Sequence, residues 1–492
     1  MCTYLAVLSF SWLFLSIRFV AEVPTLLDMR LFCASKLGLG DDDMRTVTWP
    51  AVVSRLVATQ TSTRLSLVRD MTALDVAARI LRRENYLMGA INQGALHLTL
   101  PWLRGALGQQ CWLTTGVQWS LYWAVLNPLF DDHSRLRPLS ADKLATRCRL
   151  IAIAQLLLTP FIAVYMGLYY FMRNAERVYH HPSAVGARRW SGEARWRMRH
   201  YNEYPHVLEA RLSAAKPAAT AYCACFPNHV VSLCARFVAF VVGALAAALL
   251  ALAAVDERLL EAVLWGRNLL WYTAVCGTLL AASRALIADD APGSVRPDPV
   301  ASLAACVAHT HFMPRRWRNA SGNSRLVYGE FTALFPSALG ALLEELASLL
   351  VAPALLWWSL PACAQELTSF LRDYTVHADG VGDICSLAAF DFERHGSSDY
   401  GANGDASQRL RSRHGALEKS FISFQAQHPD WEPGVRGKAL LDTLAQHEAR
   451  QSAIWAASTQ HAGASVEAAM DVDARCQALL QSLHEEQIDG TN

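Results

Sequence analysis

The chain alternates between long apolar runs and polar stretches with helical patterning. A helix needs roughly 20 predominantly apolar residues to span the hydrocarbon core of a bilayer, and five runs approach that length. They are Tyr4–Val23, Leu150–Phe171, Phe237–Val255, Leu264–Ala282 and Phe335–Leu360. The pattern predicts an all-α, polytopic membrane protein with transmembrane and re-entrant helices and with helical regions in the cytosol.

Two of these runs form a simple pair. Phe237–Val255 and Leu264–Ala282 contain no proline, and the short acidic stretch Asp256–Glu261 connects them. We expect a transmembrane hairpin whose turn lies in the lumen, with Arg284 marking the return of the chain to the cytosol.

Charge places a third run differently. Met172–His229 holds nine Lys and Arg against four Glu, and Pro24–Arg149 is also rich in Arg. Positively charged flanks stay on the cytosolic side, so Leu150–Phe171 lies between two cytosolic regions. Pro160 near its middle removes a backbone hydrogen bond. A re-entrant helix–break–helix hairpin satisfies both facts, and five complete spans is the alternative.

The same reasoning applies to the last apolar run. Phe335–Leu360 contains Pro353 and the pair Glu344-Glu345. Two carboxylates are costly in hydrocarbon. We therefore expect a second re-entrant hairpin, with the carboxylates facing a watery cavity or with the segment lying at the interface.

The first run is not a typical signal peptide. No Lys or Arg precedes it, and Arg18 lies toward its C-terminal end. That polarity is wrong for a secretory signal and favours a membrane anchor with a cytosolic C-terminal flank and a lumenal N-terminus.

The expected organisation follows the residue numbers. It comprises a first span (1–23), a cytosolic helical region with an interfacial helix (24–149), a re-entrant hairpin (150–171), a basic cytosolic segment (172–229), a transmembrane hairpin (230–285), a second cytosolic helical region (286–334), a second re-entrant hairpin (335–360), a cytosolic C-terminal region (361–435) and a polar tail (436–492).

Helix starts are visible in the first cytosolic region. Thr48 precedes Trp49 and Pro50 and is typical of an N-cap followed by proline in the first turn. Thr72–Asp75 opens another helix, with Arg79, Arg82 and Arg83 opposite its apolar face. Trp112–Phe130 is strongly apolar but ends near Pro128, so we expect a helix at the interface or in the core.

Composition agrees with a membrane protein. The chain is 53% hydrophobic and 18% charged, and its mean hydropathy is +0.17. A net charge of +1 gives no general reason to expect nucleic acid as a partner. No GxGxxG, Walker A, HExxH or GxSxG motif occurs, so neither enzyme chemistry nor a cofactor is expected.

The twelve cysteines are scattered, without any CxxC pair, which favours reduced thiols over a disulfide framework. Cys223, Cys225, His229 and Cys234 invite a zinc hypothesis, but their spacing matches no common finger. His309 and His311 likewise favour packing over metal binding. We expect no metal site.

Arginine alternates with tryptophan in Arg188–His200. Such a stripe suits anionic headgroups better than stacked bases, because membrane segments flank it on both sides. A solvated cytosolic helix face is an equally good interpretation.

The stretch Asp373–Gly396 follows the last apolar run directly and contains Val381-Gly382-Asp383-Ile384-Cys385-Ser386. It resembles the signature of the autophagy-related protein 9 family. The matching residues are Asp379, Gly380, Gly382, Asp383, Cys385, Ser386 and Asp391.

Other blocks follow the family pattern in the same order. They begin at Thr48, Thr72, Gly186, Ala308, Leu342 and Gly415, so the resemblance extends over roughly residues 10–435. The chain starts at what resembles the second span of the family. Tyr179-His180-His181 replaces a charged triplet that the family usually directs into its pore, and neutral pH leaves histidine only partly charged.

The resemblance implies a homotrimer with transmembrane and re-entrant helices around a central pore. It also implies an energy-independent phospholipid scramblase on small vesicles, at the phagophore assembly site and on Golgi and endosomal membranes. Implied partners are phospholipids, a bridge-like lipid-transfer protein and other autophagy factors.

A polar track through hydrocarbon lowers the barrier for a charged headgroup. Our candidates for that track are Arg284, Glu344, Glu345, His180 and His181, with Arg199, His200, Asn202 and Glu203 at its cytosolic mouth. Alternatively, these groups hold subunits together through buried ion pairs.

Two rival functions stay open. A membrane scaffold would recruit autophagy factors without intrinsic lipid transport. An ion channel or transporter fits less well, because no inverted repeat or filter sequence is visible.

Overall fold

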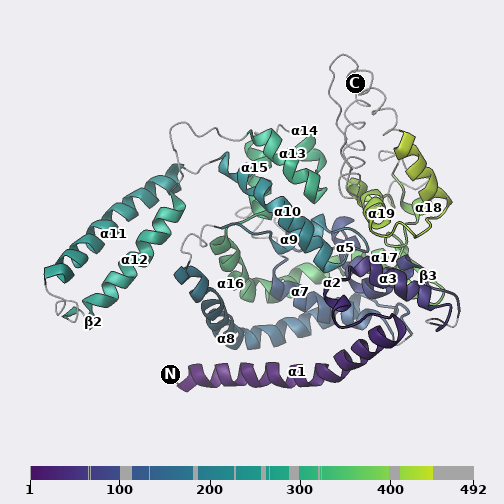
Figure 1. The fold of residues 1–492 in the computed structure, drawn as a ribbon, viewed down its shortest axis with the longest axis horizontal. Helices are drawn as coiled ribbons and strands as arrows, with labels where there is room; N and C mark the ends of the chain where they lie inside the picture. The colour runs from purple at the N-terminus through teal and green to yellow at the C-terminus, as the bar shows by residue number, and fades with distance from the viewer. Residues whose placement is uncertain are drawn as a thin grey trace, which may run out of the picture.

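The computed structural model describes residues 2–446 apart from 65, 67, 100–112, 132, 181–186, 227–228, 256–261, 265, 288–297, 320–321, 323 and 398–409. Within these residues the chain is mostly helical, with two antiparallel two-stranded hairpins (Figure 1). The expected all-α class is confirmed. The polar tail and the proposed lumenal turn Asp256–Glu261 lie outside the described residues.

Long helices dominate the architecture. They are α1 (Cys2–Lys36), α8 (Ala141–His180), α11 (His229–Val255), α12 (Leu269–Leu286), and the continuous run of α16 (Ala338–Ala354), the π-helical turn η5 (Leu355–Ser359) and α17 (Leu360–Asp373). Shorter helices are α2 (Asp43–Thr46), α3 (Trp49–Thr59), α4 (Ala73–Ile80), α5 (Arg82–Asn92), α7 (Thr115–Leu121), η1 (Tyr122–Leu126), η2 (Asn127–Leu129), α9 (Gly192–Met198), α10 (Pro205–Ala224), α13 (Pro299–Thr310), α14 (Arg315–Asn319), α15 (Arg325–Leu334), α18 (Phe392–His395), η7 (Arg413–Gly415) and α19 (Ala416–Gln427).

Three described segments are long and apolar enough to cross a bilayer. They are Ala141–Gly167, Val230–Leu252 and Gly340–Asp373. The other two apolar runs expected from the sequence form helices as well, within α1 and α12. Length and composition therefore agree with a polytopic membrane protein.

The first span does not end at Val23. Helix α1 continues through Pro24 to Lys36, a total of 35 residues. At 1.5 Å per residue it is about 50 Å long, more than the hydrocarbon core requires. Leu26, Leu27 and Met29 keep the apolar character beyond the proline, which explains why the helix does not stop there.

The break predicted at Pro160 is also absent. Residues Ala141–His180 form one 40-residue helix with Pro160 inside, and the helix bends along its length (Figure 1). Proline removes one N–H and its φ suits a helix, so it bends a long helix more readily than it ends it. The helix–break–helix geometry expected at 150–171 is therefore corrected to a bent helix.

Pro353 behaves in the same way. It lies inside α16, and the π-helical turn η5 follows directly and leads into α17. A π-helical turn absorbs the mismatch in the hydrogen-bond ladder without breaking the helix. The segment expected as a hairpin at 335–360 is thus one continuous helical path that extends to Asp373.

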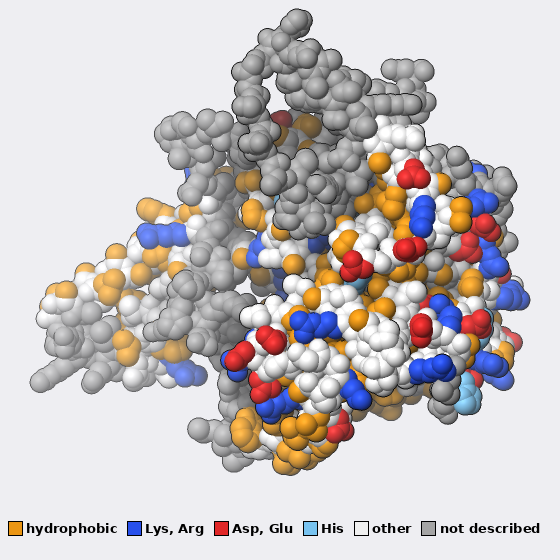
Figure 2. Space-filling model, turned by 45° about the vertical axis from the view of Figure 1, so that its right-hand side comes forward, with side chains coloured by type: hydrophobic (Ala, Val, Ile, Leu, Met, Phe, Trp, Pro, Cys, Tyr) orange, Lys and Arg blue, Asp and Glu red, His pale blue; other side chains and the backbone are white. Residues whose placement is uncertain are grey.

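Helices α11 and α12 form the expected hairpin. They pack against each other and project from the rest of the molecule (Figure 1). The small β1–β2 hairpin (Val263–Leu264 and Arg267–Asn268) joins them and takes the first residues predicted for the second helix. Hydrophobic side chains line the projecting pair (Figure 2), and the exposed ones include Val231, Phe237, Phe240, Leu250 and Leu270.

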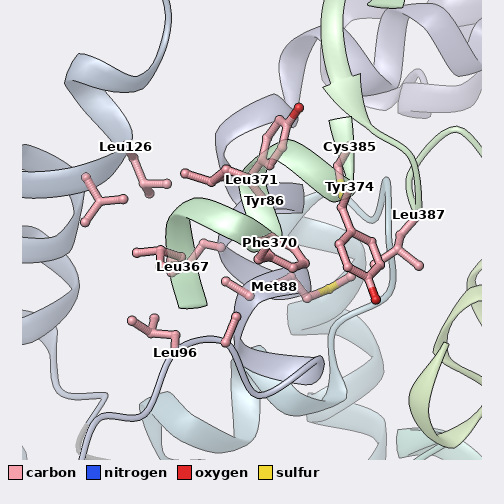
Figure 3. Close-up of a cluster of buried hydrophobic side chains, with 14 of the residues drawn as sticks. Tyr86, Met88, Leu96, Leu126, Leu367, Phe370, Leu371, Tyr374, Cys385 and Leu387 are labelled. Atoms are coloured by element: carbon pink, nitrogen blue, oxygen red, sulfur yellow. The ribbon is translucent and has the colours of Figure 1, made fainter. Parts of the chain in front are cut away.

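Two larger hydrophobic clusters hold the remaining helices together. The first gathers α5, α17 and the segment around Cys385, with Phe370 stacked on Tyr374 at a centroid distance of 4.7 Å (Figure 3). The second surrounds Tyr222 and Phe331 and joins α9, α10, α13 and α15. Loss of apolar surface from water drives both clusters.

Both predicted helix starts are confirmed. Thr48 is the N-cap of α3, with proline in its first turn. Thr72 forms a complete capping box with Asp75, because each side chain accepts a hydrogen bond from the backbone N–H of the other. Arg69 adds an ion pair to Asp75 at 2.7 Å.

We expect Thr72→Ala to lower the free energy of unfolding by about 1 kcal/mol, because the N-terminus of α4 loses its side-chain acceptor. Thermal unfolding of the detergent-solubilised protein measures the change. Thr146→Ala on α8 is the control, since that exposed hydroxyl only bonds back to Asp142 in its own helix. Equal effects of the two substitutions would contradict the role of the cap.

Candidate functional site

A carboxylate on α16 lies against the start of α7. The Glu345 Oε1 atom accepts hydrogen bonds from the backbone N–H of Thr115 at 3.1 Å and from its hydroxyl at 2.9 Å. Thr115 is the first residue of α7, and the unpaired N–H groups and dipole of a helix N-terminus favour negative charge. Sequence reasoning missed this partner because 230 residues separate the two side chains.

Two further polar contacts join α8 to the same helices. The Ser120 hydroxyl of α7 lies 3.0 Å from the side-chain oxygen of Gln155. The Thr159 hydroxyl lies 3.2 Å from the carbonyl oxygen of Leu349 in α16. We call the set of side chains that make these contacts the polar seam: Thr115, Ser120, Gln155, Thr159 and Glu345.

The other candidates for the lipid track lie in different places. Glu344 is partly buried beside Glu345, and the positive charge of Arg189 acts on it. Arg284 is exposed in the last turn of α12, on the projecting hairpin. His180 ends α8, and its side chain, like all of His181, lies outside the described residues. The two glutamates are consecutive residues of α16, and Arg284 lies on a separate element, α12.

The four residues expected at a cytosolic mouth form a buried network instead. The exposed fractions of Arg199, His200, Asn202 and Glu203 are 9%, 6%, 2% and 2%. Glu203 accepts two hydrogen bonds of 2.9 Å from the guanidinium of Arg211 and a third from the backbone N–H of His200. Within one chain these residues are buried and do not line an open surface.

Asn202 ties this network to distant parts of the chain. Its backbone N–H donates to the Asn85 side chain at 3.0 Å, and the Asn85 amide donates back to its side-chain oxygen at 2.9 Å. Its own amide donates to the carbonyl of Ala388 at 2.7 Å. Asn202 has φ +59°, a conformation that asparagine tolerates well. These three bonds fix α5, the segment before α10 and the segment after β4 to one another.

Two histidines stack inside the same region. The rings of His200 and His311 are parallel, with centroids 5.2 Å apart. Both ring nitrogens of His311 and Nδ1 of His200 are buried without a hydrogen-bond partner in the described part of the chain. Burial, with Arg211 and Lys419 nearby, lowers the pKa of both imidazoles well below the usual range. Both rings are therefore neutral at neutral pH.

The β3–β4 hairpin (Thr375–Ala378 and Gly382–Cys385) explains the sequence signature. Asp383 accepts from the backbone N–H of Leu136 at 2.7 Å and contacts the His377 ring at 2.7 Å. Gly382 has φ +97°, and a Cβ there would lie 2.7 Å from the carbonyl oxygen of Ser134. The hairpin is thereby pressed against the segment that leads into α8.

The rest of the signature is also structural. Asp379 accepts through its carbonyl from Arg69, and Gly380 has φ +79°. Cys385 is buried, which raises the pKa of its thiol to about 12 and keeps it protonated. Asp391 caps α18.

Ser386 and His395 have the appearance of a nucleophile and its base. The serine hydroxyl lies 2.7 Å from Nε2, and Nδ1 contacts the carbonyl of Leu410. However, both residues are fully buried, so no substrate reaches them. We assign the pair a packing role.

The predicted position of Arg82 on the polar face of its helix is wrong. Arg82 was expected opposite the apolar side of its helix, but it is 8% exposed and donates to the carbonyl of Val381 in the signature hairpin. It also lies over the Phe130 ring at 5.3 Å. Its pKa is lowered by burial. The guanidinium therefore links the start of α5 to the turn just before β4.

Most of the arginine and tryptophan side chains in the stripe Arg188–His200 make contacts within the chain. Arg195 pairs with Glu209, Arg197 pairs with Glu193, Arg188 donates to the carbonyl of Phe335, and Trp190 donates to that of Leu212. This favours neither headgroups nor bases as its main partner. In the described residues no group of His, Cys, Asp and Glu is arranged to hold a metal ion.

We expect Gly382→Ala to destabilise the protein by about 1–3 kcal/mol beyond any cost of its positive φ, because the new methyl group collides with the Ser134 backbone. Thermal unfolding measures the loss. Gly38→Ala is the matched control, since Gly38 has φ +62° and open space around its Cβ position. Similar losses in both variants would show that the close approach is unimportant.

Acidification tests the histidine stack. Because folding depresses the pKa of His311 below 6.5, its contribution is present above pH 6.5 and is lost as pH falls through the folded value, by up to about 1.4 kcal/mol per pH unit. We expect His311→Asn to flatten the decline of melting temperature below pH 6.5. Asparagine tolerates the φ of +55° at this position.

The effect of another titrating group and a control substitution both bear on this experiment. Burial raises the pKa of Glu418 to about 7, so that group stabilises the folded state as pH falls from 7 and opposes the histidines equally in both proteins. His206→Asn at an exposed position should leave the pH profile unchanged. A profile for His311→Asn identical to that of the parent would contradict the assignment.

Comparison with known proteins identifies the family of this chain. A family model described as autophagy protein ATG9 matches residues 1–391. The chain is 38% identical to autophagy-related protein 9 of Arabidopsis thaliana, covering 90% of this chain and 52% of that protein, and 31% identical to that of Dictyostelium discoideum, covering 87% and 62%.

A solved structure is similar as well. The cryo-EM structure of Schizosaccharomyces pombe Atg9 superposes with a TM-score of 0.57 at 29% identity and covers 77% of this chain and 87% of that one. The chain spans about half the length of the curated relatives it matches. On these matches, the chain belongs to the autophagy protein ATG9 family.

Proposed function

We propose that this protein is a phospholipid scramblase that moves lipids between membrane leaflets during autophagosome formation. It does so without an energy source or covalent chemistry. Family membership supports a role in autophagy, and the apolar helices support a place in the membrane. The observation that supports lipid movement is the polar seam between α7, α8 and α16.

The chemistry of the seam suits a headgroup path. A zwitterionic headgroup that crosses bare hydrocarbon loses the hydration of both charges. Hydroxyl, amide and carboxylate groups placed along apolar helices replace part of that hydration. Glu344 and Glu345 supply negative charge for the amine of a headgroup, and the positive charge of Arg189, which acts on Glu344, would favour its phosphate.

The buried network has a supporting role in this proposal. In this proposal, Arg199, His200, Asn202 and Glu203 hold α9 and α10 together on the cytosolic side. The Arg188 side chain and the backbone N–H of Ser191, which precede α9, bond to the carbonyl oxygens of Phe335 and Leu334 just before α16 and connect the network to that helix. They position the polar seam and do not contact the lipid themselves.

We propose a homotrimer as the working unit. The α11–α12 hairpin exposes apolar side chains along its length and projects from the body of the chain (Figures 1 and 2). Lipid and a neighbouring copy together would cover that surface. The trimer would act on small vesicles and on phagophore, Golgi and endosomal membranes. There it would receive lipids from a bridge-like transfer protein and associate with other autophagy factors.

Leaflet exchange in liposomes tests the function. The purified chain should accelerate the loss of fluorescence when dithionite is added to vesicles with labelled phospholipids in both leaflets. We expect Glu344→Leu and Glu345→Leu each to slow exchange about tenfold, corresponding to ~1.4 kcal/mol of barrier, because each removes a carboxylate from the proposed headgroup path.

Matched controls separate charge from position. Glu432→Leu and Arg45→Leu remove exposed charges outside the long apolar helices and should leave exchange unchanged. A parent protein that binds membranes and autophagy factors but exchanges no lipid would instead identify a scaffold. Ion current without lipid exchange would identify a channel.

A further inference from the structure

Three aromatic side chains form an exposed patch on α7 and η1. Trp119, Tyr122 and Trp123 are 60%, 37% and 48% exposed. Their rings contact one another edge to face, with centroids 6.1 Å apart for Trp119 and Trp123 and 5.9 Å apart for Tyr122 and Trp123. We call these three residues the aromatic patch. The opposite face of the same turns is buried, so the patch is not part of the core.

A cation borders the patch. The Arg83 guanidinium lies over the Tyr122 ring at 5.4 Å and donates to its hydroxyl. A guanidinium has five N–H donors, and this bond uses one of them. The remaining donors and the charge suit a phosphate group beside the aromatic rings.

The contact between α7 and α8 gives the depth of the patch in the membrane. Ser120, next to Trp119, bonds to Gln155 of α8. The exposed Arg149 lies six residues earlier on α8, about 9 Å along the axis at 1.5 Å per residue. The exposed side chains of α8 change from basic to apolar directly after Arg149, at Leu150, and exposed apolar residues continue to Leu157. The patch thus lies on the apolar side of this change, within about 9 Å of the last exposed basic residue.

We propose that the aromatic patch is a membrane anchor, seated in the headgroup layer of the leaflet that Arg149 faces, with Arg83 binding the phosphates of anionic phospholipids. Tryptophan and tyrosine favour this layer because one end of the ring is apolar and the other forms hydrogen bonds. A protein partner would be expected to bury such rings in a packed pocket.

The anchor has a consequence for α16. It holds α7 at a fixed depth, and α7 presents the N–H of Thr115 to Glu345. The inference goes beyond lipid exchange itself, because the patch is seated in the bilayer whether or not the protein scrambles.

Depth-dependent quenching tests the anchor in the full chain in liposomes. A fluorescent coumarin amino acid is introduced at Trp123, and the same residue at Val68, which is 69% exposed, is the control. We expect lipids with a spin label near the headgroup to quench the Trp123 site more than lipids labelled deep in the chain. Aqueous iodide should quench only the Val68 site.

Anionic lipid selectivity tests the arginine. Spin-labelled phosphatidylserine should quench the Trp123 site more than spin-labelled phosphatidylcholine, and Arg83→Gln should reduce that preference on the order of fivefold. Arg83→Lys keeps the charge and should retain most of the preference. Equal preference in Arg83→Gln and the parent would overturn the headgroup contact.

Other outcomes overturn the anchor itself. Quenching by iodide at both sites would place the patch in water. Quenching of the Trp123 site by neither iodide nor lipid would place it under another protein surface, such as a second copy of this chain. Because none of these measurements depends on dithionite exchange, a failed scramblase assay and a failed anchor are distinguishable.

Discussion

Charged and polar groups on apolar helices need hydrogen-bond partners, and the contact between Glu345 and Thr115 satisfies that requirement between α16 and α7. A carboxylate on a long apolar helix is costly in hydrocarbon unless it is hydrogen-bonded. Here the N-terminus of α7 supplies two donors to the Glu345 oxygens. The rest of the membrane-facing geometry depends on this pairing, because it holds α7 against α16 while Ser120 and Thr159 hold α8 beside them.

The same constraint organises the part of the chain outside the apolar helices. The Asn85–Asn202 pair and the Arg82–Val381 bond each join segments distant in sequence, through polar groups that are almost fully buried. Arg211 pairs with the nearby Glu203 and also donates to the distant carbonyl of Thr310. Buried polar groups stabilise only one arrangement, because any other leaves donors or acceptors unpaired. The two hydrophobic clusters supply much of the stabilisation, and these polar contacts fix how the clusters are connected.

Local features were predictable from sequence, whereas long-range ones were not. The helix starts at Thr48 and Thr72 and the proline-free hairpin of α11 and α12 depend on neighbouring residues, and the structure has them, although only Thr72 makes a side-chain capping bond. Pro160 and Pro353 were read as breaks, but long apolar helices accommodate proline by a bend or a π-helical turn. Arg199, His200, Asn202 and Glu203 were assigned to the cytosolic mouth of a lipid track from their polar character near hydrophobic segments and from the family resemblance, yet all four are buried.

The sequence signature gains a physical meaning from the structure. Gly380 and Gly382 have positive φ, and Asp383 accepts a backbone N–H from the segment before α8, so the signature specifies a docked hairpin. Gly382 closely approaches Ser134, and Asp383 accepts from Leu136, which is 247 positions away. Because these partners are distant in sequence, the motif could be recognised from the sequence but its structural role could not.

Hydration of the polar seam is the central claim of this account. Hydrogen–deuterium exchange of the liposome-embedded protein, followed by mass spectrometry, measures it most directly. The account predicts that peptides from residues 341–349 of α16 exchange faster than peptides from residues 237–250 of α11, although both are apolar helices. Equal and complete protection of both helices would contradict a hydrated passage along α16.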